Sequence, residues 1–150
     1  MELKDYAIIE GEEIDLFLDR RSLGDPQRGR SPEYKFKIRL HGSVNDIGHI
    51  NMRLGDDEKV IQYIGHIGYG IDEAFRSNKY AAKACTLLKQ VARSHGMDRV
   101  IITCNPDNFA SRRICEVIGA ELLEIVDIPV TASAYSEEEP QKCRFLWRVK

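Results

Sequence analysis

The spacing of apolar residues changes halfway along the chain, and this change limits the possible folds more than any other feature. In the first half apolar and polar residues alternate, most cleanly over residues 34–40, which is the period of a half-buried strand. From Tyr80 to His95 the apolar residues recur every three or four positions, and Gly96 follows as a helix-ending residue. The sequence therefore predicts strands first and helices later.

Four strands are expected in the first half, at residues 13–19, 34–40, 47–54 and 60–71, and short turns between the last three are typical of an antiparallel meander. The second half predicts, in order, a helix, a buried strand, a helix and two strands, at residues 80–95, 99–104, 110–118, 122–128 and 142–149. No repeat or linker interrupts this order. We expect one α/β (α+β) domain over residues 1–150, with helices packed on a mixed sheet of about seven strands.

Composition excludes several classes of protein. Hydrophobic residues make up 43% of the chain and charged residues 31%, with a net charge of −2, so no overall charge favours nucleic acid or an anionic membrane. No apolar run reaches the ~18–20 residues of a membrane span, and the acidic start lacks the pattern of a signal peptide. We expect a cytoplasmic protein without nucleic-acid or membrane partners; the sequence leaves a homodimer open.

The four cysteines are scattered rather than paired in a C-x-x-C motif. This spacing indicates neither a zinc site nor a disulfide framework. Buried free thiols that pack as small hydrophobic residues are expected instead, and no metal. The four are Cys85, Cys104, Cys115 and Cys143.

A glycine-rich strand runs directly into the long amphipathic helix. Gly65, Gly68 and Gly70 weaken a strand, so their density indicates a bulge or the close approach of another molecule. The helix start that follows offers free backbone N–H groups and a positive dipole end, which favour a phosphate, and Arg76 and Lys79 add charge. The alternative is a bulged strand followed by an ordinary basic helix start.

Two motifs resemble those of the GNAT acetyltransferases. Arg76-x-x-Lys79-x-Ala81 resembles the pyrophosphate motif of that family, Arg/Gln-x-x-Gly-x-Gly/Ala, and stands between the fourth strand and the long helix. The segment 102–120 is similar to the family's strand-Asn-x-x-Ser-helix segment at Asn108, Ser111 and Gly119. Two separate motifs at the right spacing are more specific than either alone.

The resemblance implies a sheet splayed between the fourth and fifth strands, with the pantetheine arm of acetyl-CoA in the gap. It implies direct transfer of an acetyl group to a small-molecule or peptide amine in a ternary complex. The alternatives are a catalytically inactive coenzyme A-binding module with this fold and an unrelated dinucleotide-binding domain. The residues implied in cofactor binding are Tyr69, Gly70 and Ile71 for pantetheine, Ser77, Asn78, Lys79, Tyr80, Ala81 and Ala82 for the pyrophosphate, and Asn108 and Ser111 on the opposite side.

The chain departs from the family pattern at several positions. Lys79 replaces the usual first glycine of the phosphate motif, and Cys115 stands where many members carry a tyrosine acid. Residues 20–31 form only a loop where the family has one or two helices that shape the acceptor site. The acceptor therefore cannot be transferred by resemblance.

Two side chains are candidates for proton transfer. His66 is the expected base because imidazole titrates near neutrality, with a hydrogen-bonded structural histidine as the alternative. Cys115 is the candidate acid, with simple packing as the alternative. His49 and Glu73 are weaker candidates for the base.

Several arginines crowd the loop 20–31, with Lys35 nearby. They could recruit an acidic acceptor or the 3′-phosphate of coenzyme A, and the alternative is a solvated basic loop. The residues are Arg20, Arg21, Arg28 and Arg30.

Overall fold

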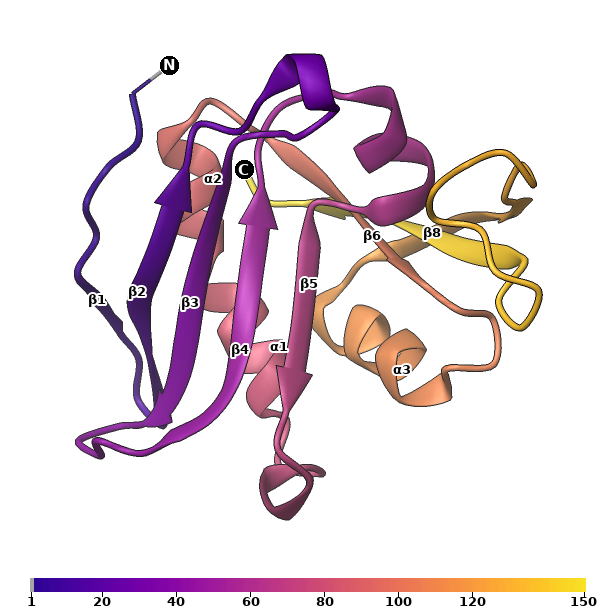
Figure 1. Cartoon of the computed structure of the whole chain (residues 1–150). Helices are drawn as coiled ribbons and strands as arrows, with labels where there is room; N and C mark the ends of the chain where they lie inside the picture. Colours follow the sequence, from indigo (N-terminus) through magenta and orange to yellow (C-terminus); the bar gives the residue numbers. More distant parts are fainter. Residues whose placement is uncertain (1) are drawn as a thin grey trace.

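The computed structural model describes residues 2–150, whose strands form two antiparallel sheets. The first sheet has the order β1-β2-β3-β4-β5 and the second the order β6-β8-β7 (Figure 1). The first comprises β1 (Ile8–Glu10), β2 (Ile14–Ser22), β3 (Glu33–Leu40), β4 (Asp46–Arg53) and β5 (Ile67–Ile71), and the second β6 (Arg99–Cys104), β7 (Glu121–Asp127) and β8 (Gln141–Arg148).

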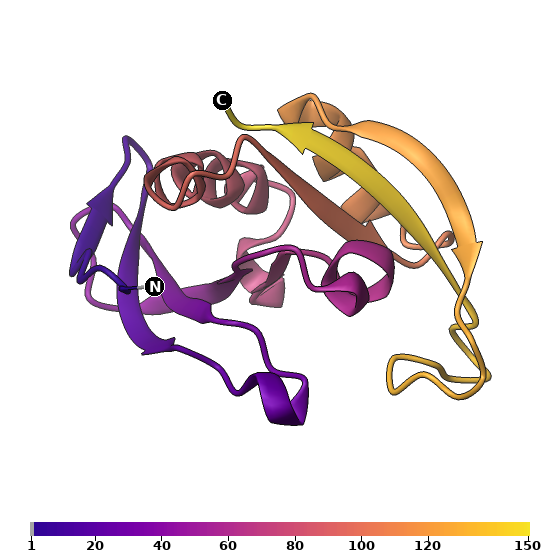
Figure 2. The same cartoon turned by 90° about the horizontal axis from the view of Figure 1, so that it is seen from above.

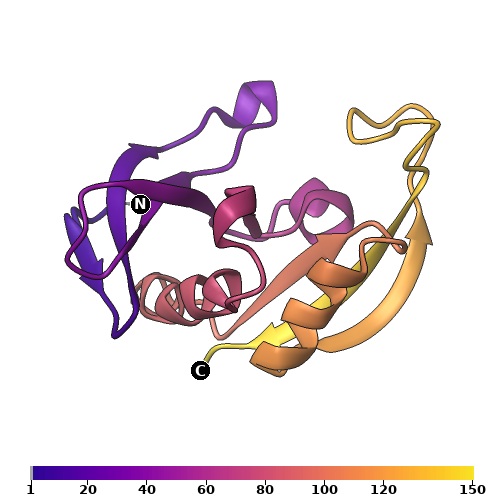
Figure 3. The same cartoon turned by 90° about the horizontal axis from the view of Figure 1, so that it is seen from below.

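The helices lie on one side of these sheets, and the other side is left open. Figure 2 shows α1 and α2 behind the first sheet, and Figure 3 shows α3 against the second. α1 contacts β2, β5 and α3, so it packs where the two sheets meet. The helices are α1 (Tyr80–Leu87), α2 (Lys89–Ser94) and α3 (Phe109–Ile118), and the short helical turns are η1 (Pro26–Arg28), η2 (Val60–Ile64) and η3 (Glu73–Phe75).

The core lies between the helices and the inner faces of the strands. Tyr34, Phe36 and Ile38 of β3 are buried, which confirms the alternation that predicted this strand. Cys143, Phe145 and Trp147 are buried on one face of β8, and Val149, which follows the strand, is buried as well. All four cysteines are buried free thiols, and Cys104 lies directly opposite Cys143 across β6 and β8.

The predicted fold class and the splay are confirmed, but the single mixed sheet is not. The structure has eight strands, and no parallel ladder joins β5 to β6 within residues 2–150. Each sheet is therefore antiparallel throughout.

The strand predicted over residues 60–71 is in fact a helical turn followed by a short strand. Residues 60–64 have four apolar members around Gln62, a pattern that fits a short helical turn as well as a strand. The structure forms η2 there, and Gly65, at φ +80°, ends it by donating to the Val60 carbonyl at 2.7 Å.

The helix predicted over residues 80–95 divides at Leu88 into α1 and α2, although the Leu88 amide still bonds to Ala84. Gly96 and Gly119 take the left-handed conformation expected of helix-ending glycines, at φ +75° and +87°. Among the described residues no helix combines the length and the apolar character that a membrane span requires.

Candidate active site

β5 and β6 are joined at one end and diverge from there. The backbone of His66, just before β5, forms hydrogen bonds with both sheets. Its carbonyl accepts from the Arg53 amide of β4 at 2.7 Å, and its own amide donates to the Ile101 carbonyl of β6 at 2.7 Å. Beyond this joint the two backbones diverge towards Ile71 and Cys104 (Figure 1), and the space between the two strands is called the gap below.

The backbone of β5 presents alternate residues to the gap. The Arg53 amide donates to the His66 carbonyl and the Asp72 amide to the Ile47 carbonyl. These two bonds fix which residue pairs of β4 and β5 are hydrogen-bonded. Because this pattern alternates in antiparallel strands, Gly68 and Gly70 direct their N–H and C=O groups to β4, and Tyr69 and Ile71 direct theirs to the gap. Tyr69 and Ile71 thus have the backbone orientation expected for pantetheine binding, whereas Gly70 does not.

The side chain of His66 completes the joint. Its Nδ1 accepts from the Ile101 amide at 2.8 Å, which leaves Nε2 to donate to the Gly55 carbonyl at 2.8 Å. The ring is 4% exposed, and burial holds the pKa of His66 below its usual value. With both nitrogens engaged by backbone groups, the ring has no lone pair for a substrate, which favours the structural alternative for His66.

The turn after β5 prepares backbone N–H groups at the start of α1. Ser77 and Lys79 adopt left-handed conformations at φ +69° and +63°, and the side-chain Nδ2 of Asn78 donates to the Phe75 and Arg76 carbonyls, both at 3.2 Å. The first backbone bond of the helix runs from Lys83 to Lys79. The amides of residues 80–82 precede that bond and remain available.

Lys79 keeps the backbone conformation for which the family motif uses glycine. A left-handed lysine is disfavoured by contacts of its Cβ, whereas glycine adopts the same angles freely. The Lys79 side chain is exposed. The available amides of residues 80–82 and the exposed Lys79 side chain are groups that can bind a phosphate.

The opposite wall of the gap belongs to α3. The Asn108 side chain caps this helix by accepting from the Ser111 backbone amide at 3.1 Å. The Ser111 hydroxyl accepts from the Tyr69 hydroxyl at 3.0 Å. Three residues predicted to bind the cofactor are thus brought together across the gap.

Cys115, on α3, is completely buried. Burial raises the pKa of its thiol to about 12, with the cysteines around it acting in the same direction. A thiol so shielded holds its proton more tightly than an ordinary one, which favours the packing alternative.

His49, which the sequence marked only as a weak candidate for the base, lies on the exposed face of the first sheet. His49 of β4 is paired with Gly70, and a Cβ at Gly70 would come within 2.7 Å of the His49 Cε1 atom. Gly70 therefore leaves room for an exposed imidazole beside the gap. The register between β4 and β5 is the information that the sequence lacked.

Comparison with known proteins identifies the fold. Residues 9–121 match the family model of the acetyltransferase (GNAT) domain. The chain belongs to the GNAT acetyltransferase family. This membership removes the dinucleotide-binding alternative. No curated protein matches the chain.

Solved structures of GNAT proteins share the fold at low sequence identity. One from Chromobacterium violaceum has a TM-score of 0.70 at 14% identity, covering 99% of this chain and 89% of its own. RimL, a ribosomal protein acetyltransferase in complex with coenzyme A, has a TM-score of 0.67 at 14% identity, and the match covers 94% of this chain and 97% of RimL. The microcin C7 self-immunity acetyltransferase MccE, in complex with acetyl-CoA and AMP, has a TM-score of 0.59 at 17% identity. The match covers 77% of this chain and 61% of the MccE chain.

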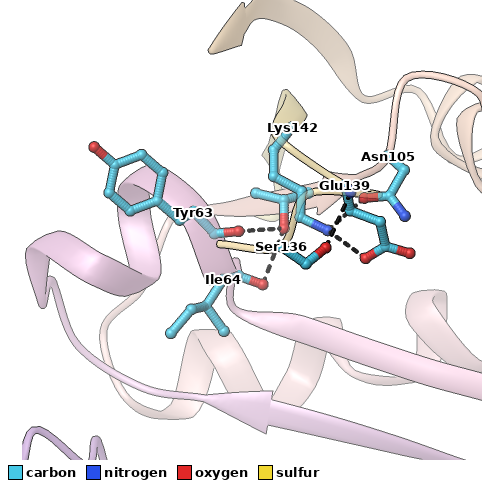
Figure 4. A network of polar contacts seen from close by, with 7 residues as sticks. Tyr63, Ile64, Asn105, Ser136, Glu139 and Lys142 are labelled. Atoms are coloured by element: carbon cyan, nitrogen blue, oxygen red, sulfur yellow. Dashed lines mark hydrogen bonds and ion pairs between the residues drawn. The ribbon is translucent and has the colours of Figure 1, made fainter. Parts of the chain in front are cut away.

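In this GNAT chain the acidic loop between β7 and β8 is anchored beside the end of β6. Figure 4 shows Lys142 between Asn105, which accepts its hydrogen bond, and Glu139, 3.9 Å away. The Glu139 amide donates to the Ser136 hydroxyl at 3.0 Å. This loop thus has defined contacts near the end of β6.

η2 is fixed to the same strand. The Thr103 hydroxyl of β6 lies 3.1 Å from the Tyr63 carbonyl and 3.0 Å from the Ile64 carbonyl (Figure 4). η2 therefore lies against β6 at the narrow end of the gap, opposite the end where α1 begins.

Proposed function

We propose that this protein transfers an acetyl group from acetyl-CoA to an amine, by direct attack in a ternary complex. The observation that carries the proposal is the edge of β5 that does not pair with β4, on which the Ile71 carbonyl accepts a hydrogen bond from Arg76 Nε at 2.9 Å. Its gap-facing backbone groups lead from the His66 joint towards the amides at the start of α1. A pantetheine arm can add to this edge as an extra strand while the pyrophosphate meets the helix N-terminus.

Each part of acetyl-CoA has a proposed partner. Tyr69 and Ile71 would hold pantetheine through their backbone, and the amides of residues 77–82 would hold the pyrophosphate. Asn108 and Ser111 would line the other side. The complexes of RimL with coenzyme A and of MccE with acetyl-CoA, which share this fold, support the assignment.

The chemistry needs an oxyanion donor and a base. A neutral amine attacks the thioester carbon, the C–S bond breaks, and the coenzyme leaves as a thiolate that takes up one proton. A gap-facing N–H of Tyr69 or Ile71 would stabilise the oxyanion. His49 would accept the proton that the amine loses, because its imidazole is exposed beside the gap and that of His66 is not.

No side-chain acid is required for the leaving group. An ordinary thiol has a pKa of about 8.5. Cys115, with its pKa raised to about 12, would give up its proton to such a thiolate only against a gradient of several units. Solvent is the better donor for the thiolate.

The test measures binding and transfer separately. Acetyl-CoA, and not NAD, should raise the melting temperature, by an amount that corresponds to ~2.7 kcal/mol at 100 times Kd. An amine and peptide panel should then show free thiol release above the hydrolysis rate. Tight binding without release for any acceptor would instead establish the catalytically inactive alternative.

A further inference from the structure

A basic cavity of about 410 Å³ opens on the exposed face of the first sheet, between the η1 loop and η2. Its floor is formed by β2, β3 and β4, and the η1 loop projects beside it (Figure 2). Two carboxylates, Glu33 and Asp57, line it. Its cationic residues are Arg20, Arg30, Lys35 and Arg53.

The positive charge of the cavity is largely uncompensated. Lys35 is 3.8 Å from Glu33, but within residues 2–150 no carboxylate lies within 4.0 Å of Arg20, Arg30 or Arg53. In a chain of net charge −2, this is a local excess of positive charge.

The cavity is a structured site rather than a solvated loop. Asp25 and Arg30 exchange two backbone hydrogen bonds of 2.9 Å, which close the η1 loop and fix the position of Arg30. The Arg53 guanidinium is oriented by its bond of 3.2 Å to the Gly65 carbonyl, and its other N–H groups remain free to bind.

The cavity is continuous with the proposed reaction centre. Arg53 and His49 lie on the same face of β4, four residues or about 13 Å apart along the strand. A Cβ at Gly68 of β5 would lie 4.0 Å from Arg53 Nη1, so the floor continues to the strand that borders the gap. The amides at the start of α1 are at the other end of β5, which separates this cavity from the phosphate site.

We propose that the cavity binds an anionic group, a carboxylate or a phosphate, on the amine acceptor. Guanidinium groups pair with either anion through two parallel hydrogen bonds. An acceptor held there by its anion would extend its amine along β4 towards His49 and the thioester. This inference rests on the proposed function and names the acceptor class, which is an anionic amine.

The experiment compares matched acceptors and matched variants. Peptides with Asp or Glu at positions two to four are paired with their Asn or Gln counterparts, and phosphoethanolamine with ethanolamine. The acidic member of the preferred pair should have the lower KM. Arg20→Gln with Arg30→Gln should raise that KM about tenfold in low salt, since partly exposed ion pairs each contribute a few-fold. Which pair responds distinguishes a peptide from a small molecule.

Arg28→Gln is the control, because Arg28 belongs to the same loop but pairs with Asp25 outside the cavity. It should leave the KM unchanged, and every variant should keep the wild-type Kd for acetyl-CoA. Weaker acetyl-CoA binding in the double variant would assign the cavity to the 3′-phosphate and overturn the proposal, as would equal rates for acidic and neutral acceptors.

A binding measurement makes the inference independent of turnover. The N-acetylated acidic peptide and inorganic phosphate are titrated into the wild type and the double variant, with backbone amide NMR shifts as the readout. Shifts at Arg30 and Arg53 that the double variant loses are expected even if no acceptor is acetylated. Absence of binding in the wild type would refute the anion site, whereas absence of thiol release with intact binding would refute only the proposed function.

Discussion

The Tyr69 hydroxyl donates a hydrogen bond of 3.0 Å to the Ser111 hydroxyl, and this bond connects β5 to α3 across the gap. Tyr69 extends from β5 and Ser111 from the first turn of α3. Burial raises the pKa of Tyr69, so the phenol keeps its proton and donates throughout the neutral range. The proposed pantetheine site thus already contains a polar link between its walls.

Removing this link should cost stability but not cofactor affinity. Tyr69→Phe deletes one partly buried hydrogen bond and should lower the free energy of unfolding by about 1 kcal/mol. Ser111→Ala is the matched variant from the other side. Denaturant unfolding and the acetyl-CoA Kd are the measurements. A fall in kcat beyond ~100-fold for Tyr69→Phe, with Kd unchanged, would show instead that the phenol acts on the reacting atoms.

Lys79→Gly should make the protein more stable. Glycine adopts the left-handed angles of this position without the cost of about 1 kcal/mol that a Cβ imposes, and thermal unfolding should show the gain. Ser77→Gly relieves the same conformation without removing charge. If the Lys79 ammonium binds phosphate, only Lys79→Gly should weaken acetyl-CoA, and more so at low salt. Equal affinity of both variants for acetyl-CoA would show that the Lys79 side chain does not contribute to phosphate binding.

His66 should make stability depend on pH in the weakly acidic range. Its folded pKa is depressed by burial, so the unfolded chain binds the extra proton more readily. The stability that neutral His66 provides is complete above about pH 6.5 and declines as the pH falls towards the folded pKa.

His66→Gln should therefore lose most relative to the wild type at pH 7.5 and less at pH 5, as urea unfolding at both values would reveal. His41 acts in the opposite sense, because Asp15 raises its pKa, and His41→Gln serves as the control. A difference between wild type and His66→Gln that is independent of pH would refute the depressed pKa.

His49→Ala should slow transfer about 100-fold or more without weakening acetyl-CoA, if the imidazole takes the proton from the amine. Gly70→Val should act through the same group, since its Cβ would displace the His49 ring. Cys115→Ala should change stability slightly and the rate little. Loss of acetyl-CoA binding in Gly70→Val would show that the space beside Gly70 belongs to the cofactor instead.

The sequence was sufficient where a local pattern decides the structure. Alternation identified β3, and the three-to-four-residue spacing of apolar positions identified α1 and α2, because both patterns depend on neighbours in the chain. The splay followed from the family resemblance. Residues 60–64 were assigned wrongly because a short, mostly apolar segment suits a helical turn or a strand, and only packing decides between them.

The roles of the histidines needed information that no local pattern carries. His66 has partners 11 and 35 residues away, and His49 lies over Gly70 only because of the register between β4 and β5. A one-residue change of that register would have turned His49 to the other face of the sheet. Two histidines that look alike in the sequence, His49 on β4 and His66 just before β5, therefore lie in opposite environments.

The alternation along β5 has a consequence for isotope exchange. The amides of Gly68 and Gly70, bonded to β4, should exchange with deuterium slowly, whereas those of Tyr69 and Ile71, which face the gap, should exchange quickly. Adjacent residues of one strand would then differ in protection. Acetyl-CoA should slow the fast pair selectively, so exchange at these four positions would follow the docking of the pantetheine arm one amide at a time.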